Sequence, residues 1–194
     1  MMDLLKLLTN LSSNQTALNQ LNQSVDAKPT QVQRLVQLGL PVLMEALNRN
    51  VSTPQGAQAL TSALEQHQED NTDDLTGFIE KVDTEDGSKI LQHVFENKNQ
   101  MVQNNLSKQT GLNTNQVGSL MAKLAPLMLG ALGNQKKAQN LDATGVASLA
   151  STLSKGLQQS GGGNLFSLAK QLLDADKDGD IMDDLGNLFR KFKR

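Results

Sequence analysis

The chain has 194 residues, of which 38% are hydrophobic and 3% aromatic, and it contains no cysteine. The lack of cysteine excludes disulfide bonds, thiolate catalysis and cysteine-ligated metals. A net charge of −2 excludes electrostatic binding of nucleic acid by the chain as a whole, and no apolar run reaches the roughly 18 residues of a membrane span. A core built from leucine, valine, methionine and alanine suits helices, so we predict an all-α, multihelical protein.

Residues 1–19 are expected to form an N-terminal leucine-rich helix that docks on the core or on a second subunit. An acid, Asp3, precedes the short apolar stretch, and neither a basic segment nor a small-residue cleavage site is present. These features indicate a helix rather than a signal peptide. We therefore expect a cytoplasmic location.

The next segments alternate helical patterns with capping and breaking signals. A helix over 15–25 ends before Pro29, and Thr30 with a glutamine three residues later has the pattern of a capping box. Thr53 followed by Pro54 predicts the N-cap and first position of a helix that ends near residue 66. A short helix over 75–82, a break over 83–87 and a helix over 90–104 are expected to follow.

One helical pattern occurs twice, over residues 32–47 and 117–132, at a constant offset of 85. In both copies the apolar residues follow i, i+3, i+4, i+7 spacing, which is typical of a helix with one buried face. Pro41 and Pro126 occupy the same place in the two copies. A proline inside a helix costs about 3 kcal/mol unless the helix kinks, and its recurrence favours a kinked, continuous helix over one that stops and restarts.

The second copy is expected to be followed by similar elements. A loop over 133–140, a helix capped by Asp142, a Gly161–Gly163 joint and a helix over 165–173 are predicted. We therefore predict two tandem homologous helical repeats, residues 20–105 and 106–194, which pack together about a pseudo-twofold axis.

The second central pattern also carries a family resemblance. NQVGSLMAKLAPLMLGALG, residues 115–133, resembles the signature of the YidB-like bacterial family (domain of unknown function 937). The ending LLDADKDGDIMDDLGNLF is similar to the tail common in that family, so the resemblance runs from about residue 20 to the end. It implies an all-helical, multihelical fold. It brings no activity, because none is established for the family.

A run of aspartates near the C-terminus is the strongest candidate for a site. Its acidic residues are Asp174, Asp176, Asp178, Asp180, Asp183 and Asp184. Acids at positions 1, 3 and 5 with a glycine at 6 match the start of an EF-hand calcium loop. Leu185 stands at position 12, where the pattern requires a bidentate glutamate, so Asp183 or Asp184 would have to close the site. Calcium binding would then be weak, with a dissociation constant of about 10⁻⁵ to 10⁻³ M.

Other interpretations of the acidic residues stay open. The run over 174–184 is otherwise an acidic turn that binds nothing at cellular calcium. The similar stretch from Asp83 to Gly87 is one residue shorter and is interpreted as a decayed copy of it. His67 and His93 are predicted to be solvated surface side chains, because no metal-binding motif surrounds them.

The last residues, 188–194, are basic with two phenylalanines. They could contact anionic lipid or nucleic acid, but we favour a helix end whose cations complement the helix dipole. No nucleophile motif, phosphate-binding loop or dinucleotide fingerprint is present, so no catalytic or cofactor-binding residue is predicted.

We therefore predict a non-enzymatic structural or interaction protein of the bacterial cytoplasm, which self-associates or binds a protein partner. No small-molecule substrate is evident. One alternative is a calcium-responsive binding module that uses residues 174–184. The other is a weak nucleic-acid or membrane-surface binder that acts through the basic tail.

Overall fold

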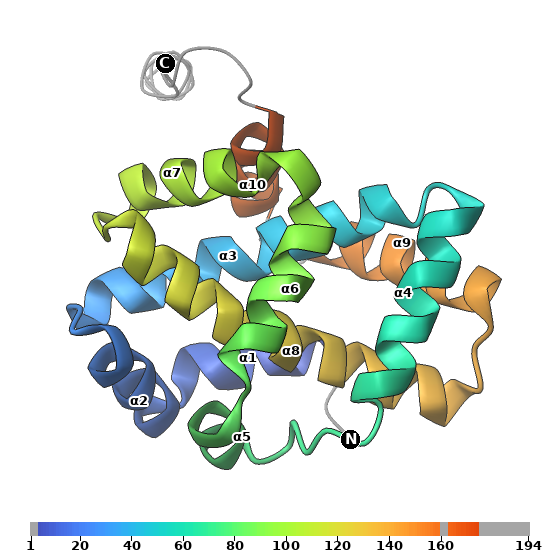
Figure 1. Ribbon diagram of the computed structural model, residues 1–194, viewed down its shortest axis with the longest axis horizontal. Coiled ribbons are helices and arrows are strands. Elements are labelled where there is room, and N and C mark those ends of the chain that lie inside the picture. The colour runs from blue at the N-terminus through green and yellow to red at the C-terminus, as the bar shows by residue number, and fades with distance from the viewer. Residues whose placement is uncertain (1–3, 160–162, 175–194) are drawn as a thin grey trace.

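Two long helices, α3 (Pro29–Asn50) and α8 (Thr114–Gln139), run through the middle of the structure, and shorter helices surround them (Figure 1). The computed structural model describes residues 4–159 and 163–174. Within these ranges the chain forms helices and contains no strand, which confirms the predicted all-α, multihelical class. The shorter elements are α1 (Leu4–Ser13), α2 (Gln15–Val25), α4 (Pro54–His67), α5 (Leu75–Lys81), α6 (Thr84–Phe95), the 3₁₀ turn η1 (Glu96–Lys98), α7 (Asn99–Thr110), α9 (Ala143–Gln159) and α10 (Gly163–Asp174).

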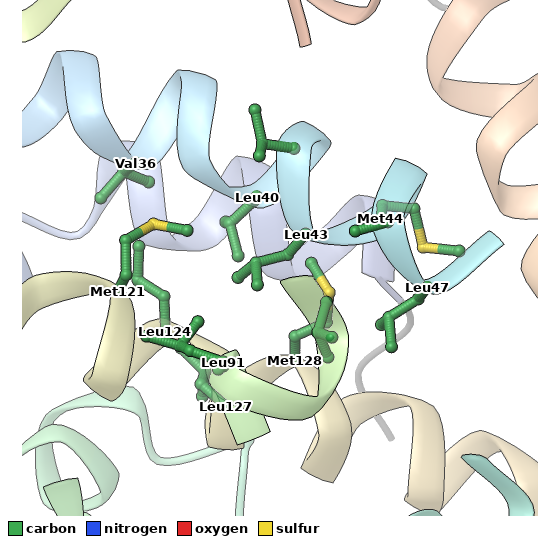
Figure 2. Packing of buried hydrophobic residues seen from close by; sticks show 14 of the residues in the cluster. Val36, Leu40, Leu43, Met44, Leu47, Leu91, Met121, Leu124, Leu127 and Met128 are labelled. Atoms are coloured by element: carbon green, nitrogen blue, oxygen red, sulfur yellow. The ribbon is translucent and has the colours of Figure 1, made fainter. Parts of the chain in front are cut away.

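Both central helices continue through their internal prolines, Pro41 and Pro126. Continuous helices are therefore confirmed, and the interpretation in which each helix stops and restarts is wrong. Both prolines are buried. The apolar faces of α3 and α8 turn toward each other, and Figure 2 shows Leu40 and Leu43 of α3 opposite Leu124 and Met128 of α8. The helix-period stripe in the sequence is thus the centre of the core.

The outer helices pack on the two central helices in a reciprocal pattern. Helix α3 contacts α9 and α10, which follow α8 in the chain, whereas α8 contacts α4 and α6, which follow α3. Buried hydrophobic side chains from α1 to α10 form one cluster, so residues 20–105 and 106–174 share a single core. This exchange of helices is what a pseudo-twofold arrangement requires, while the duplication itself stays a prediction.

The leucine-rich N-terminal helix docks on the core of its own chain. Helix α1 contacts α2, α3, α8 and α9, and the side chains of Leu7 and Leu11 are completely buried. Of the two expected uses of this helix, docking on the core is therefore the one observed. No described helix has the combination of length and apolar character that crossing a bilayer requires.

Two predicted helix starts are confirmed by their hydrogen bonds. The Thr53 hydroxyl accepts from Gly56 N at 3.1 Å, and Pro54 is the first residue of α4. The Asp142 carboxylate accepts from Gly145 N at 2.8 Å at the start of α9. Side-chain acceptors at these positions satisfy amide groups that have no partner within the helix.

The predicted N-cap at Thr30 is wrong, because α3 already begins at Pro29. Proline is favoured at a first helical position, where its missing N–H costs nothing. The side chain of Gln31, rather than that of residue 33, accepts from Lys28 N at 3.2 Å. Gln31 also donates to the carbonyl of Gly111 at 2.5 Å, so it connects the starts of the two central helices.

The loop predicted over 133–140 is also wrong, because α8 continues to Gln139. Gly133 does not end the helix but allows a close approach to α4. A Cβ atom there would lie 2.7 Å from the carbonyl oxygen of Leu64. The helix ends at Asn140 instead, whose φ of 49° is left-handed, a conformation common at helix ends.

The single helix predicted over 90–104 is divided into three elements. Helix α6 ends at Phe95, Glu96 has a φ of 49°, and the 3₁₀ turn η1 leads into α7. No glycine or proline marks this break in the sequence. The break predicted over 83–87 is shorter than expected, since Thr84 to Gly87 form the first turn of α6. Gly111, with a φ of 73°, ends α7.

Candidate functional site

The described part of the chain contains one of the six predicted calcium ligands. Asp174 is the last residue of α10, while Asp176, Asp178, Asp180, Asp183 and Asp184 lie outside the described residues. Leu185 and the basic tail over 188–194 lie outside them as well. The geometry at Asp174 therefore shows how the chain enters the acidic run.

Both carboxylate oxygens of Asp174 accept hydrogen bonds from one guanidinium group. Arg49, at the end of α3, donates from Nη1 to Oδ1 at 2.5 Å and from Nη2 to Oδ2 at 2.9 Å. The same arginine donates from Nε to Oε1 of Glu45 at 3.1 Å. Glu45 is 4% exposed, and it lies one turn before Arg49 on α3. A bidentate pair like that of Arg49 with Asp174 is strong and directional. Glu45 therefore orients Arg49, and Arg49 holds Asp174.

The last carbonyl groups of α10 are also bonded. Lys98 Nζ in η1 donates to the carbonyl of Leu173 at 3.2 Å, and Asn105 Nδ2 in α7 donates to that of Leu172 at 3.0 Å. The carbonyls of a final helical turn have no partners within the helix, and cations there complement the helix dipole. We call Arg49, Lys98 and Asn105 the α10 clamp, because they fix the point where the acidic run begins.

The charges at the α10 clamp reinforce one another. Hydrogen bonding to Arg49 lowers the pKa of Asp174, against the opposing effect of desolvation. The hydrogen bond to Asp174 is the largest cause of the raised pKa of Arg49, with a further contribution from Glu45. The ion pair therefore stabilises the fold above the usual aspartate pKa and is lost as the pH falls through the lower folded-state value. Since the Asp174 side chain is 55% exposed, solvent screening keeps this contribution small.

A second group of ionisable side chains lies between α4, α5 and α6. It surrounds a pocket of about 410 Å³ whose lining includes His67, Asp70, Asp74, Asp83 and Asp86. His67 is not a solvated surface residue, as the sequence suggested, because its side chain is only 13% exposed. Its Nδ1 hydrogen-bonds to Oδ2 of Asp70 at 2.9 Å, and its Nε2 lies 3.5 Å from Oδ2 of Asp86. His93 is exposed, as predicted.

The other acids of this pocket hold helix ends. Asp74 accepts from Gly77 N at 3.0 Å and caps α5. Asp83 accepts from the amides of Glu85 and Asp86 at 2.8 and 3.2 Å and caps α6. The stretch from Asp83 to Gly87 therefore starts a helix, whereas Asp174 ends one. Over residues 4–159 and 163–174, no three histidine or acidic side chains are placed to hold a metal ion.

Sequence reasoning found Asp174 but missed Arg49, which lies 125 residues earlier. It also missed the environment of His67. Helical spacing would not have indicated the pair of His67 with Asp70, because α4 ends at His67 and Asp70 lies in the following loop. No local signal connects His67 with Asp86, because the packing of α6 beside α4 brings them together.

Comparison with known proteins gives one match. The family model described as "Bacterial protein of unknown function (DUF937)" matches residues 7–135, a range that includes both central helices. No curated protein and no solved structure matches the chain.

Proposed function

Because the chain belongs to the bacterial family of unknown function DUF937, we propose a function from its own geometry: a non-enzymatic structural or interaction protein that self-associates or binds a protein partner. The observation that carries this proposal is the use of the gathered ionisable side chains. Asp74 and Asp83 cap helices, Asp70 binds His67, and Asp174 binds Arg49. These groups stabilise a scaffold of helices, and the outer faces of those helices would bind the partner.

The main apolar surfaces of the helices are used within one chain. The apolar faces of α3 and α8 pack against each other, and Leu7 and Leu11 of the N-terminal helix are buried. A contact between copies would therefore use other faces of the helices. One such surface is an open groove of about 950 Å³ beside α6 and α8, lined among others by Ser88, Lys89, Gln103, Asn115 and Lys123. Hydroxyl, amide and ammonium groups there suit the polar backbone and side chains of a protein segment.

Self-association is tested by sedimentation velocity over a hundredfold range of protein concentration. We expect the weight-average sedimentation coefficient to rise with concentration. Exchanging Lys89 and Lys123 for glutamate would reverse two charges in the groove and is expected to weaken a contact made there, while Lys155→Glu on α9 serves as an exposed control. A strict monomer that also captures no protein partner would contradict the proposal.

A calcium-responsive module is the second candidate, and the α10 clamp favours it. The clamp holds the first of the six predicted ligands at the end of a helix, which is where an EF-hand loop begins. The same ion pair would weaken calcium binding, because a calcium ion that binds the Asp174 carboxylate has to displace the Arg49 guanidinium group. Such an exchange would couple calcium binding to α3 at the centre of the fold.

Replacing Arg49 with glutamine is therefore expected to raise calcium affinity by about two- to tenfold, equivalent to at most about 1.4 kcal/mol. The variant frees the Asp174 carboxylate and removes a nearby positive charge. Lys155→Gln, at an exposed position of α9, also removes one positive charge, so it is the matched control and should leave the affinity unchanged. Calorimetric titration of chelator-treated protein measures both. If neither the parent protein nor Arg49→Gln releases heat up to millimolar calcium, the calcium module is excluded.

A further inference from the structure

A small groove between α3 and α10 carries an exposed leucine. The groove has a volume of about 320 Å³, and its lining includes Arg34, Gln37, Leu38, Leu165 and Leu168. Leu165 is 38% exposed, and among the side chains that the structure describes it is the only large hydrophobic one that is exposed. The floor of the groove is apolar, because Leu38 is buried and Leu168 packs against the core. An apolar segment placed over this groove would bury the exposed part of Leu165.

Helix α8 has no leucine at the position that corresponds to Leu38 of α3, so the fold does not require a leucine there. At the constant offset of 85, Leu38 of α3 corresponds to Lys123 of α8. Lys123 also lines a groove, and its neighbour across that groove on α6 is Lys89. The groove beside α8 thus has lysines at these positions, whereas the groove beside α3 has leucines among the polar side chains of Thr30, Gln33, Arg34 and Gln37. These leucines are the part of the groove that an apolar segment would cover.

The position of Asp174 limits which occupant can reach the groove. Leu165 and Leu168, in the first half of α10, border the groove, and the α10 clamp fixes the other end of this helix beside Arg49. Helix α10 has 12 residues and is about 18 Å long at 1.5 Å per residue. Twenty residues follow Asp174 in the chain. Even at a helical rise they span about 30 Å, which is enough to return along α10 to the groove.

The sequence of those residues has an apolar pattern that suits the leucines of the groove. Its apolar side chains follow i, i+4, i+7, i+8 and i+11 spacing, at Ile181, Leu185, Leu188, Phe189 and Phe192. This is the spacing of an amphipathic segment with one apolar face. Two acids, at 183 and 184, and two basic residues, at 190 and 191, lie between these positions. The acids are the groups of this segment that can pair with Arg34 on the rim of the groove.

We propose that the groove between α3 and α10 is the docking surface for residues 181–192 of the same chain, whose apolar positions cover Leu165 and Leu168. This inference does not depend on the proposed function. It gives the acidic run a structural setting, because residues 175–180 would connect the α10 clamp to the docked segment.

The test uses the lack of native cysteine. Asn187→Cys introduces a single thiol for a nitroxide spin label on the full-length, ¹⁵N-labelled chain. We expect the label to broaden the amide NMR signals of residues 33–38 and 164–168, and to leave residues 57–66 of α4 sharp. Leu165→Lys makes the groove resemble its counterpart beside α8 and should abolish the broadening. Gln158→Lys, at an exposed position of α9, should retain it.

A mixture of ¹⁵N-labelled chain without the spin label and spin-labelled chain without ¹⁵N identifies the molecule that supplies the segment. Sharp groove signals in this mixture support docking within one chain. Broadened groove signals would show that a second copy fills the groove, which overturns the proposal. Groove signals that stay sharp in the singly labelled protein, or that broaden equally in Leu165→Lys, also overturn it.

Discussion

Replacing Gly87 with alanine is expected to lower the free energy of unfolding by about 2–4 kcal/mol, because the added methyl group has no space. Gly87 lies in the first turn of α6, directly against α8. A Cβ atom there would be 1.8 Å from the carbonyl oxygen and 2.7 Å from the carbonyl carbon of Ala122. Both atoms belong to the backbone of α8 and cannot rotate away. The two helices would have to separate and would lose part of the contact between them.

A second glycine provides the matched control for this substitution. Gly156 lies within α9, and no atom lies within 4 Å of a Cβ atom built on it. Gly156→Ala should therefore stabilise the protein by about 0.5–1 kcal/mol, since alanine is favoured over glycine in a helix interior. Urea denaturation followed by circular dichroism measures both variants. Equal stabilities for Gly87→Ala and Gly156→Ala would show that α6 does not approach α8 as closely as described.

Replacing Leu43 with alanine should also cost about 2–5 kcal/mol of unfolding free energy. Leu43 is 1% exposed and extends from α3 toward Met128 of α8, which is equally buried (Figure 2). Removing three side-chain carbon atoms there opens a cavity between the two central helices. The loss combines the transfer free energy of the removed atoms with the free energy of the cavity.

Leu149→Ala on α9 is the chemically identical control. Leu149 is only partly buried at the edge of the core, so its truncation should cost about 1 kcal/mol or less, since solvent and neighbouring side chains can fill the space. Thermal and urea unfolding of the two variants measures the difference. If Leu149→Ala were as destabilising as Leu43→Ala, the contact between α3 and α8 would not be the centre of the core.

Local sequence signals predicted much of the helical framework correctly. The repeated apolar stripe indicated α3 and α8, and capping by Thr53 and Asp142 marked the starts of α4 and α9. Such signals work because an N-cap acts within three residues and a helical stripe within two turns. The same local reasoning failed at Gly133, which looked like a helix end. There the glycine serves the close approach of α4, and a contact between distant segments cannot be read from its neighbours in the sequence.

The residues of the candidate site also divide into those that local sequence signals indicate and those that only contacts between distant segments bring together. The aspartate run could be recognised from spacing alone, because metal-binding loops place their ligands close together in sequence. The ion-pair partner of Asp174, Arg49, could not be recognised, since only the packing of α10 against α3 brings its guanidinium group to Asp174. His67 was misjudged for a similar reason, because Asp86 approaches it only through the placement of α6.

The sequence by itself thus determined the all-helical class, the two long central helices and the capped starts of α4 and α9, because these depend on composition and on contacts within a few residues. Only the tertiary structure decided that the outer helices exchange between α3 and α8, that Arg49 holds Asp174, and that Leu165 borders a groove between α3 and α10. These features depend on which helix faces meet. Many pairings of similar leucine-rich stripes bury comparable apolar area, and the choice among them is made by side-chain packing across the whole core.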